Sequence, residues 1–279
     1  MKQFILIGST GGLGNGLISH LPDSTIAISG QRVRHWISQS NSRNFKMALE
    51  TDLPNLSKSS LVLINCVGIT NPLGNIDELV KVNYDFPLRL LQSLDEKIAT
   101  FVNFGSVLES FVQDDTNAYL NTKVRISTAL RMFDTKTRLI NFKLNTIYGG
   151  YKNPAHLLIG QLENSIKMRT TLPLSSGSQI REYHHLRDVS IVLSDIIQQG
   201  SVFGEIDLNY GFATTIRDVI YQIMRNLNLD HLLDFNFRED PVNDNYNYWP
   251  SKSEYLKGYT FRDPVAGITS YLQSRIAQH

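Results

Sequence analysis

The 279-residue sequence contains a single cysteine, Cys66, and has no apolar run as long as a membrane-spanning helix requires. One thiol excludes an internal disulfide and any metal site built from several cysteines. The first ten residues include a short apolar run but no small-residue cleavage site, so we do not interpret them as a signal peptide. We therefore expect a cytoplasmic protein with no membrane partner.

An excess of charge of one sign is also missing. Lys and Arg number 27 and Asp and Glu 26, which gives a net charge of +1. This balance argues against a dedicated nucleic-acid-binding protein, which usually carries a strongly basic domain or stripe. Hydrophobic residues make up 42% and aromatic residues 10%, a composition that excludes a disordered chain. The length fits one large domain or two small ones.

Short apolar runs alternate with helical patterns along most of the chain. The pattern predicts strands over 4–7, 25–29, 45–49, 61–65, 101–104 and 139–144. It predicts helices over 79–94, 118–133, 189–197, 215–227 and 264–276, and Pro87 should bend the first of these or mark a turn in it. Such alternation indicates βαβ units, and hence an α/β fold with a doubly wound parallel sheet of the Rossmann type.

A glycine-rich loop follows the first predicted strand. Gly8, Gly11 and Gly14 have the spacing G-x-x-G-x-x-G, and a helical pattern begins within the loop. In a dinucleotide site the first glycine allows a tight turn, the second lets the backbone approach a pyrophosphate, and the third lets the helix pack against the strand. We assign the rest of the cofactor contacts in this loop to Thr10, Gly12 and Leu13. An ordinary glycine-rich turn between a strand and a helix is the alternative.

The second predicted strand leads into a basic segment. An NAD site usually has an acid here for the ribose hydroxyls, but this segment offers Arg32 and Arg34 instead. Because a guanidinium can bind a 2′-phosphate with two hydrogen bonds, we expect NADP(H) to be preferred, with NAD(H) still open and solvated loop charges as the alternative. Asp52, after the third predicted strand, could accept a bond from the adenine amino group, or could simply initiate a turn. Its neighbour Leu53 is assigned to the same cofactor site.

Several further motifs occur in a set order. The chain has Asn65-Cys66-Val67-Gly68, then Asn83, Ser106 and Tyr119-x-x-x-Lys123, and later Arg181-Glu182-Tyr183-His184-His185-Leu186-Arg187-Asp188-Val189. Together with the glycine loop, these motifs resemble the extended short-chain dehydrogenase/reductase superfamily. More narrowly, they resemble its NAD-dependent epimerase/dehydratase branch, which acts on nucleotide sugars. The resemblance covers nearly the whole chain.

The resemblance implies a catalytic role for Ser106, Tyr119 and Lys123. Tyr119 and Lys123 are four residues apart and so lie on one helix face. We expect the ammonium to lower the pKa of the phenol, which would then pass a proton to or from a carbonyl oxygen that Ser106 binds. By the same resemblance, further cofactor contacts come from Cys66, Val67, Gly68, Asn83, Lys123, Asn145 and Ile147. Substrate contacts are expected from Thr70, Ser106, Tyr119, Thr146 and Arg181, the last at the pyrophosphate.

Two reactions of this branch are disfavoured. Its dehydratases have an Asp-Glu pair directly after the residue that matches Ser106, whereas this chain has Val107 and Leu108, with Glu109 one place later. The epimerase/reductases that make GDP-fucose have a cysteine where this chain has Leu108. Simple hydride chemistry at a ketone remains. We expect NADPH-dependent reduction of a keto group, at C4 of a nucleotide-linked deoxysugar, in polysaccharide biosynthesis.

Two alternatives stay open at this point. A nucleotide-sugar 4-epimerase with tightly held NAD needs only the same Ser, Tyr and Lys. A non-catalytic NADP-sensing protein could use the same fold, although such sensors generally lack the Tyr and Lys. No metal site is expected, because His184 and His185 have no third ligand at suitable spacing.

The motif positions also predict a division of the chain. We expect residues 1–148 to form the NAD(P)-binding domain, joined by a returning segment near 184–212. Residues 149–183 and 213–279 should form a smaller, interleaved substrate-binding lobe. A nucleotide sugar is the expected partner, and the resemblance allows a homodimer.

Overall fold

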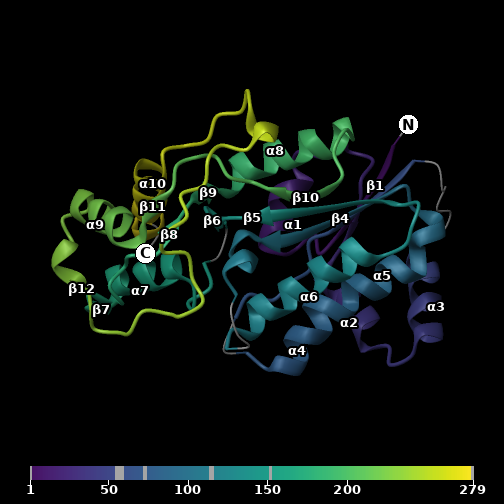
Figure 1. Ribbon diagram of the computed structural model, residues 1–279, viewed down its shortest axis with the longest axis horizontal. Coiled ribbons are helices and arrows are strands. Elements are labelled where there is room, and N and C mark those ends of the chain that lie inside the picture. The colour runs from purple at the N-terminus through teal and green to yellow at the C-terminus, as the bar shows by residue number, and fades with distance from the viewer. Residues whose placement is uncertain (1, 54–59, 72–73, 113–115, 151–152, 278–279) are drawn as a thin grey trace. The chain divides into compact units, whose positions relative to one another are not determined.

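The computed structural model describes residues 2–53, 60–71, 74–112, 116–150 and 153–277 (Figure 1). The described chain divides into two compact units. The first comprises 1–144 and 193–207, and the second comprises 145–192 and 208–279.

A six-stranded sheet forms the centre of the first unit, and every strand pair in it is parallel. In spatial order the strands are β10 (Gly204–Asp207), β5 (Arg138–Leu144), β4 (Thr100–Ser106), β3 (Leu61–Asn65), β1 (Gln3–Ile7) and β2 (Ile26–Ile28). The central strands are buried along almost their whole length, as is usual for a parallel sheet covered on both faces. The predicted α/β class and parallel sheet are therefore confirmed.

Helices follow the strands of this sheet. They are α1 (Gly12–Ile18), α2 (Gly30–Ser38), α3 (Ser42–Asp52), α4 (Ile76–Val80), α5 (Phe86–Leu94) and α6 (Ala118–Met132), and the C-terminal half of α8 (Leu186–Gln199) also belongs to this unit. Figure 1 shows α5 and α6 side by side along the sheet. Residues Lys81–Asp85 form a π-helical turn between α4 and α5, so the predicted helix 79–94 is interrupted just before Pro87.

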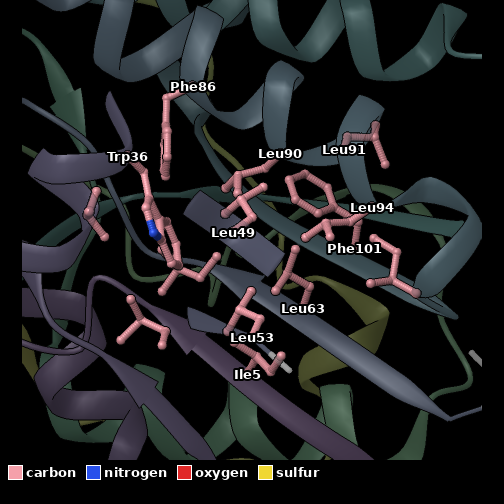
Figure 2. Packing of buried hydrophobic residues seen from close by; sticks show 14 of the residues in the cluster. Ile5, Trp36, Leu49, Leu53, Leu63, Phe86, Leu90, Leu91, Leu94 and Phe101 are labelled. Atoms are coloured by element: carbon pink, nitrogen blue, oxygen red, sulfur yellow. The ribbon is translucent and has the colours of Figure 1, made fainter. Parts of the chain in front are cut away.

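One face of the sheet packs on a large apolar cluster. Ile5 of β1 and Leu63 of β3 meet side chains from α2, α3, α5 and α6, and Trp36 is completely buried among them (Figure 2). These strand residues alternate with residues that face the opposite side, as the period of two requires. The cluster fixes the position of the sheet and of the helices that carry the candidate site.

The predicted strand over 45–49 is wrong, because these residues lie in α3. Phe45 and Leu49, one helical turn apart, are both fully buried, while Lys46 and Met47 between them are exposed. Asn41 caps the helix by accepting a hydrogen bond from the Asn44 N–H at 2.8 Å. The apolar residues thus follow the helical period, and a window of five residues was too short to show it.

Among its described residues the second unit contains three complete α-helices, the N-terminal half of α8 and three short strand pairs. The helices are α7 (Leu158–Met168), α9 (Ile216–Asn226) and α10 (Pro264–Ile276). The strand pairs are β6 (Thr146–Tyr148) with β9 (Tyr183–His185), β8 (Ile180–Arg181) with β11 (Thr214–Thr215), and β7 (Leu172–Pro173) with β12 (Leu233–Asp234). An apolar cluster of its own, which includes Leu162, Ile223 and Ile268, holds the three helices together.

Candidate active site

The glycine loop joins β1 to α1 in a tightly packed turn. Gly8 has a φ of +83°, and a Cβ there would meet the Val67 side chain at 3.0 Å. A Cβ on Gly14 would lie only 2.2 Å from the carbonyl oxygen of Gly8. Gly12, in contrast, has nothing within 4 Å of such an atom. Steric crowding therefore requires glycine at two of these positions, and at Gly12 the surroundings leave open space.

Thr10 fixes the far side of the loop. Its Oγ1 accepts a hydrogen bond from the Gly30 N–H at 3.0 Å, which ties the loop to the first residue of α2. Gly11 donates its N–H to the carbonyl of Gly8 at 3.0 Å, and Leu13 is half-buried in α1. The residues assigned to the glycine loop thus form one local structure.

Arg32 and Arg34, the two basic residues after β2, do not lie where we expected them. Arg32 and Arg34 lie on α2, not on a loop, because the helix begins at Gly30 directly after the short strand. Both are exposed. The Arg32 guanidinium is 3.4 Å from the Asp52 carboxylate, so part of its charge is already paired.

We predicted that Asp52 follows a strand, but it is the last residue of helix α3. Its Oδ2 accepts a hydrogen bond from the buried indole N–H of Trp36 at 2.7 Å. Its neighbour Leu53 is 3% exposed and belongs to the apolar cluster of the sheet. The structure therefore gives both residues a role in packing.

Cys66, Val67 and Gly68 continue the chain after β3. The Cys66 N–H donates to the carbonyl of Ile7 at 2.9 Å, and Asn65 Oδ1 accepts from the Val67 N–H at 3.2 Å. Burial raises the pKa of the Cys66 thiol, so it stays protonated at neutral pH and is a poor nucleophile. A Cβ on Gly68 would lie 3.8 Å from the Lys123 ammonium, which brings this loop next to the proposed catalytic helix.

Asn83 holds the same loop from the π-helical turn. Its side chain accepts from the Ile69 N–H at 2.8 Å and donates to the Ile69 carbonyl at 2.9 Å. It also donates to Thr122 Oγ1 on α6 at 3.1 Å. Thr70, which directly follows Ile69 in this loop, is exposed. Asn83 thus joins the loop after β3 to α6, and π-helical turns are frequent at functional sites.

Ser106, Tyr119 and Lys123 lie at the carboxyl end of β4 and on α6. Ser106 is the last residue of the strand, and its Oγ accepts from the Leu108 N–H at 3.2 Å. The Lys123 ammonium donates to the Phe104 carbonyl at 2.8 Å and lies 6.0 Å from the centre of the Tyr119 ring. The carboxyl ends of parallel strands are where ligands bind in open α/β folds.

The pKa values of Tyr119 and Lys123 differ from the expectation. Burial lowers the pKa of Lys123 to about 8, against an opposing effect of the Glu109 charge. Burial raises the pKa of Tyr119, and Glu109 raises it further. The predicted lowering of the Tyr119 pKa by Lys123 is therefore not found, because burial of the phenol dominates. Tyr119 carries its proton at neutral pH.

Glu109 is a part of this site that the sequence reasoning did not assign. It is 8% exposed and accepts two short hydrogen bonds, from the Ser106 N–H and the Ser127 hydroxyl, both at 2.6 Å. The Lys143 ammonium lies 3.8 Å away. Ser106 and Glu109 together form a capping box at the start of the 3₁₀ turn Val107–Phe111. The S-x-x-E pattern is readable in the sequence and could have revealed the contact.

The remaining predicted residues belong to the second unit. Thr146 and Ile147 lie in β6, and the Asn145 side chain donates to the Leu208 carbonyl at 2.8 Å and to Asn209 at 2.9 Å. The His184 ring nitrogen Nε2 forms a hydrogen bond with the buried Glu182 carboxylate at 2.9 Å. No group of three or more metal-binding side chains occurs among the described residues.

Arg181 forms a strong ion pair within this unit. Its two terminal nitrogens meet the two carboxylate oxygens of Asp244, each at 2.5 Å, and one also donates to the Ile180 carbonyl. The side chains of the pair are only 13% and 8% exposed. Asp244 was not singled out from the sequence. The guanidinium expected at a pyrophosphate therefore already has a carboxylate partner.

Known proteins of solved structure match this chain over almost its whole length. No family model matches the sequence. Among solved structures, the chain is similar to a UDP-glucuronic acid 4-epimerase from Bacillus cereus in complex with a fluorinated sugar nucleotide and NAD (TM-score 0.74, 15% identity, 99% of this chain and 100% of that chain). It is also similar to DesIV, a dTDP-glucose 4,6-dehydratase from Streptomyces venezuelae with NAD bound (TM-score 0.73, 13% identity, 100% and 98%).

A third match is RMD from Pseudomonas aeruginosa complexed with NADPH (TM-score 0.71, 14% identity, 99% and 100%). Identities this low establish the fold alone. Within the described residues, no helix has both the length and the apolar character to cross a membrane. The resemblance drawn from the motifs is thus confirmed at the level of the fold, which these three solved structures share with at least 99% of the chain.

Proposed function

We propose that this protein is an NAD(P)-dependent enzyme of the extended short-chain dehydrogenase/reductase type that reduces a keto group, at C4, of a nucleotide-linked deoxysugar. The observation that carries the proposal is the placement of Ser106, Tyr119 and Lys123 at the carboxyl edge of the sheet. Ser106 ends β4, and Tyr119 and Lys123 lie on one face of α6, with the ammonium 6.0 Å from the centre of the tyrosine ring. A tyrosine at this edge can donate its proton to a carbonyl oxygen.

The proposed reaction divides between the cofactor and the chain. NADPH, when bound, supplies the hydride that adds to the carbonyl carbon. Tyr119 gives its proton to the carbonyl oxygen, and the Ser106 hydroxyl donates a hydrogen bond that orients this oxygen. Lys123, near the loop after β3, would bind the nicotinamide ribose and restore a proton to Tyr119 from solvent. The oxygen thus gains one proton while the carbon gains the hydride.

The glycine loop fits a dinucleotide. A Cβ at Gly14 would collide with the loop itself, whereas the open space at Gly12 leaves room for a phosphate to approach the backbone. Arg32 and Arg34 on α2, with no acid at the end of β2, support a preference for NADP(H). NAD(H) stays the alternative, because Asp52 competes for Arg32.

In this proposal the first unit binds the cofactor and supplies Thr70 for the sugar, and the second unit supplies Arg181 and Thr146 for the nucleotide sugar. Arg181 would contact the pyrophosphate, a role suited to a guanidinium, while sharing its charge with Asp244. Thr70 and Thr146 would contact the sugar. The fold shared with enzymes whose complexes contain NAD, NADPH or a sugar nucleotide supports this assignment.

A turnover assay with a panel of 4-keto nucleotide sugars tests the proposal. We expect NADPH oxidation, measured at the cofactor absorbance band, with at least one sugar. Tyr119→Phe should lower kcat about 100-fold or more while NADPH binding persists. Tyr221→Phe, on an exposed tyrosine of α9, is the matched control and should have no effect.

Two other outcomes would redirect the proposal. If the purified protein retained NAD and interconverted two C4-epimers without net oxidation of NADPH, it would be a 4-epimerase. If NADPH bound but no sugar reacted, and Tyr119→Phe left the biological activity intact, the protein would be a cofactor sensor.

A further inference from the structure

A chain of buried side-chain hydrogen bonds crosses the first unit beneath the proposed reaction centre. Three asparagines lie on the adjacent strands β3, β4 and β5, and each donates its amide to the next group. Asn65 donates to Asn103 at 3.0 Å, Asn103 to Asn141 at 3.1 Å, and Asn141 to the Ser127 hydroxyl at 2.8 Å. Ser127 then donates to Glu109 at 2.6 Å. Glu109 is therefore the final acceptor of the whole chain.

Both ends of this hydrogen-bond chain hold backbone that the proposed reaction uses. At one end Asn65 accepts from the Val67 N–H in the loop after β3. At the other end Glu109 Oε1 accepts from the Ser106 N–H. All five side chains of the chain, Asn65, Asn103, Asn141, Ser127 and Glu109, are at most 8% exposed. Because buried hydrogen bonds of this kind strengthen one another, they fix the two backbone segments together.

Glu109 also brings a negative charge to this buried place. The ionisable groups that face it are Tyr119 and Lys123 from α6 and Lys143 from β5. Lys143 is shared with Glu205 of β10, at 3.2 Å from that carboxylate. Burial raises the pKa of Glu109, but the bonds from Ser127 and Ser106 and the Lys143 charge oppose this effect. Both of its oxygens accept hydrogen bonds, which is the pattern that suits an ionised carboxylate.

We propose that Glu109 is a positioning residue of the reaction centre: it fixes the Ser106 backbone through its hydrogen bond, and its negative charge favours the ammonium form of Lys123. This inference rests on the proposed function. A carboxylate near an amine favours the ammonium. The Lys123 ammonium donates to the Phe104 carbonyl at 2.8 Å, two residues along β4 from Ser106, whose N–H donates to Glu109. The charge of Glu109 therefore opposes the loss of the Lys123 proton that burial favours.

Titration of Lys123 itself tests the charge effect without any substrate. Lysines labelled with 13C at Cε would be followed by NMR from pH 6 to 11, with the Lys123 signal assigned from its loss in Lys123→Arg. The wild-type midpoint should lie at about 8. Glu109→Gln should move it down by about one pH unit, since the opposing carboxylate is gone. The glutamine can still accept from the Ser106 N–H, so the capping box is retained.

Two control variants separate charge from structure. Glu205→Gln removes an equal charge on the far side of Lys143 and should leave the Lys123 midpoint unchanged. Ser127→Ala removes a hydrogen bond to Glu109 but keeps its charge, so the midpoint should again stay in place. If Glu109→Gln leaves the midpoint at its wild-type value, or if Glu205→Gln moves it as far, the charge role is overturned.

The wild-type protein provides a measurement that needs no variant. In a titration extended below pH 6, the Lys123 signal should show a second, smaller step where Glu109 takes up its proton. The step should persist in Glu205→Gln, and its absence in the wild type would overturn the proposal even if Glu109→Gln failed to fold.

Enzyme kinetics then test the positioning role. In Glu109→Gln the basic limb of the kcat profile for reduction should shift to lower pH together with the Lys123 midpoint, whereas a merely structural defect would lower the rate at every pH alike. Ser127→Ala should lower kcat without moving the limb. If Lys123 titrates as expected but wild-type protein reduces no sugar, the proposed function fails while the coupling of Glu109 to Lys123 stands.

Discussion

The indole nitrogen of Trp36 lies 2.7 Å from a carboxylate oxygen of Asp52 and donates a hydrogen bond to it. The bond joins α2 to the end of α3, inside the cluster that supports the sheet (Figure 2). The residue that the sequence pointed to as an adenine contact is thus the acceptor for a buried donor.

Asp52→Ala should destabilise the protein. The variant leaves the Trp36 N–H without this acceptor in a buried place, which costs about 1–3 kcal/mol in the free energy of unfolding. Asp52→Asn keeps an acceptor oxygen and should lose less. Urea denaturation measures both variants. If Asp52→Asn instead weakened NADPH binding at unchanged stability, the adenine contact would be the correct assignment.

Alanine at Gly14 should affect stability, whereas alanine at Gly12 should affect cofactor binding. Gly14→Ala places a Cβ 2.2 Å from the Gly8 carbonyl oxygen and should lower stability by about 1–3 kcal/mol. Gly12→Ala meets no protein atom within 4 Å and should fold normally. Its Kd for NADPH, measured by calorimetry, should rise nonetheless if a phosphate approaches that backbone. Unchanged affinity in a folded Gly12→Ala protein would remove the phosphate from this position.

Asp244 should restrain the Arg181 guanidinium. Arg181→Ala leaves a carboxylate buried without its partner and should cost about 3 kcal/mol of stability. Asp244→Asn leaves the guanidinium with its full charge and should bind nucleoside diphosphates more tightly than wild type. Titration with UDP, GDP, CDP and dTDP checks this prediction. Equal affinities in wild type and Asp244→Asn would mean that Arg181 does not meet the pyrophosphate.

Lys123 should make stability depend on alkaline pH. Its pKa is lowered from 10.5 to about 8, so between pH 8 and 10.5 the unfolded chain binds a proton that the folded chain has released. Where the unfolded state binds more protons, stability rises with pH. The contribution of Lys123 to stability should thus increase from pH 8 to pH 9.5.

The measurement compares urea denaturation of wild type and Lys123→Met across this range. Burial of Cys66 raises its pKa from 9.0 and works in the opposite direction, but it is common to both proteins. The difference between the two slopes isolates Lys123. Identical slopes would show that Lys123 titrates alike in the folded and unfolded states.

Strands with a continuous apolar run were the easiest elements to predict. Residues 61–64 are buried on both faces of a parallel sheet, so burial alone makes them apolar. The segment 45–49 was misassigned because Phe45 and Leu49 satisfy a short apolar window as well as a helical turn. The glycine loop was found because its backbone tolerates few other residues at Gly8 and Gly14.

The parts of the site that escaped prediction depend on partners far apart in the sequence. Arg181 and Asp244 are separated by 63 positions, and no local pattern links them. The hydrogen-bond chain from Asn65 to Glu109 can form only when β3, β4 and β5 lie side by side in register. The raised pKa of Tyr119 likewise follows from burial, which a Tyr-x-x-x-Lys pattern does not contain.

The two units have a consequence for how the protein can be divided in the laboratory. The chain passes from one unit to the other after residues 144, 192 and 207, and the second passage falls inside helix α8. No single contiguous fragment therefore corresponds to either unit. We expect truncation at any of these points to yield an incomplete core. Separate expression of the first unit would require a designed linker that joins residue 144 to residue 193.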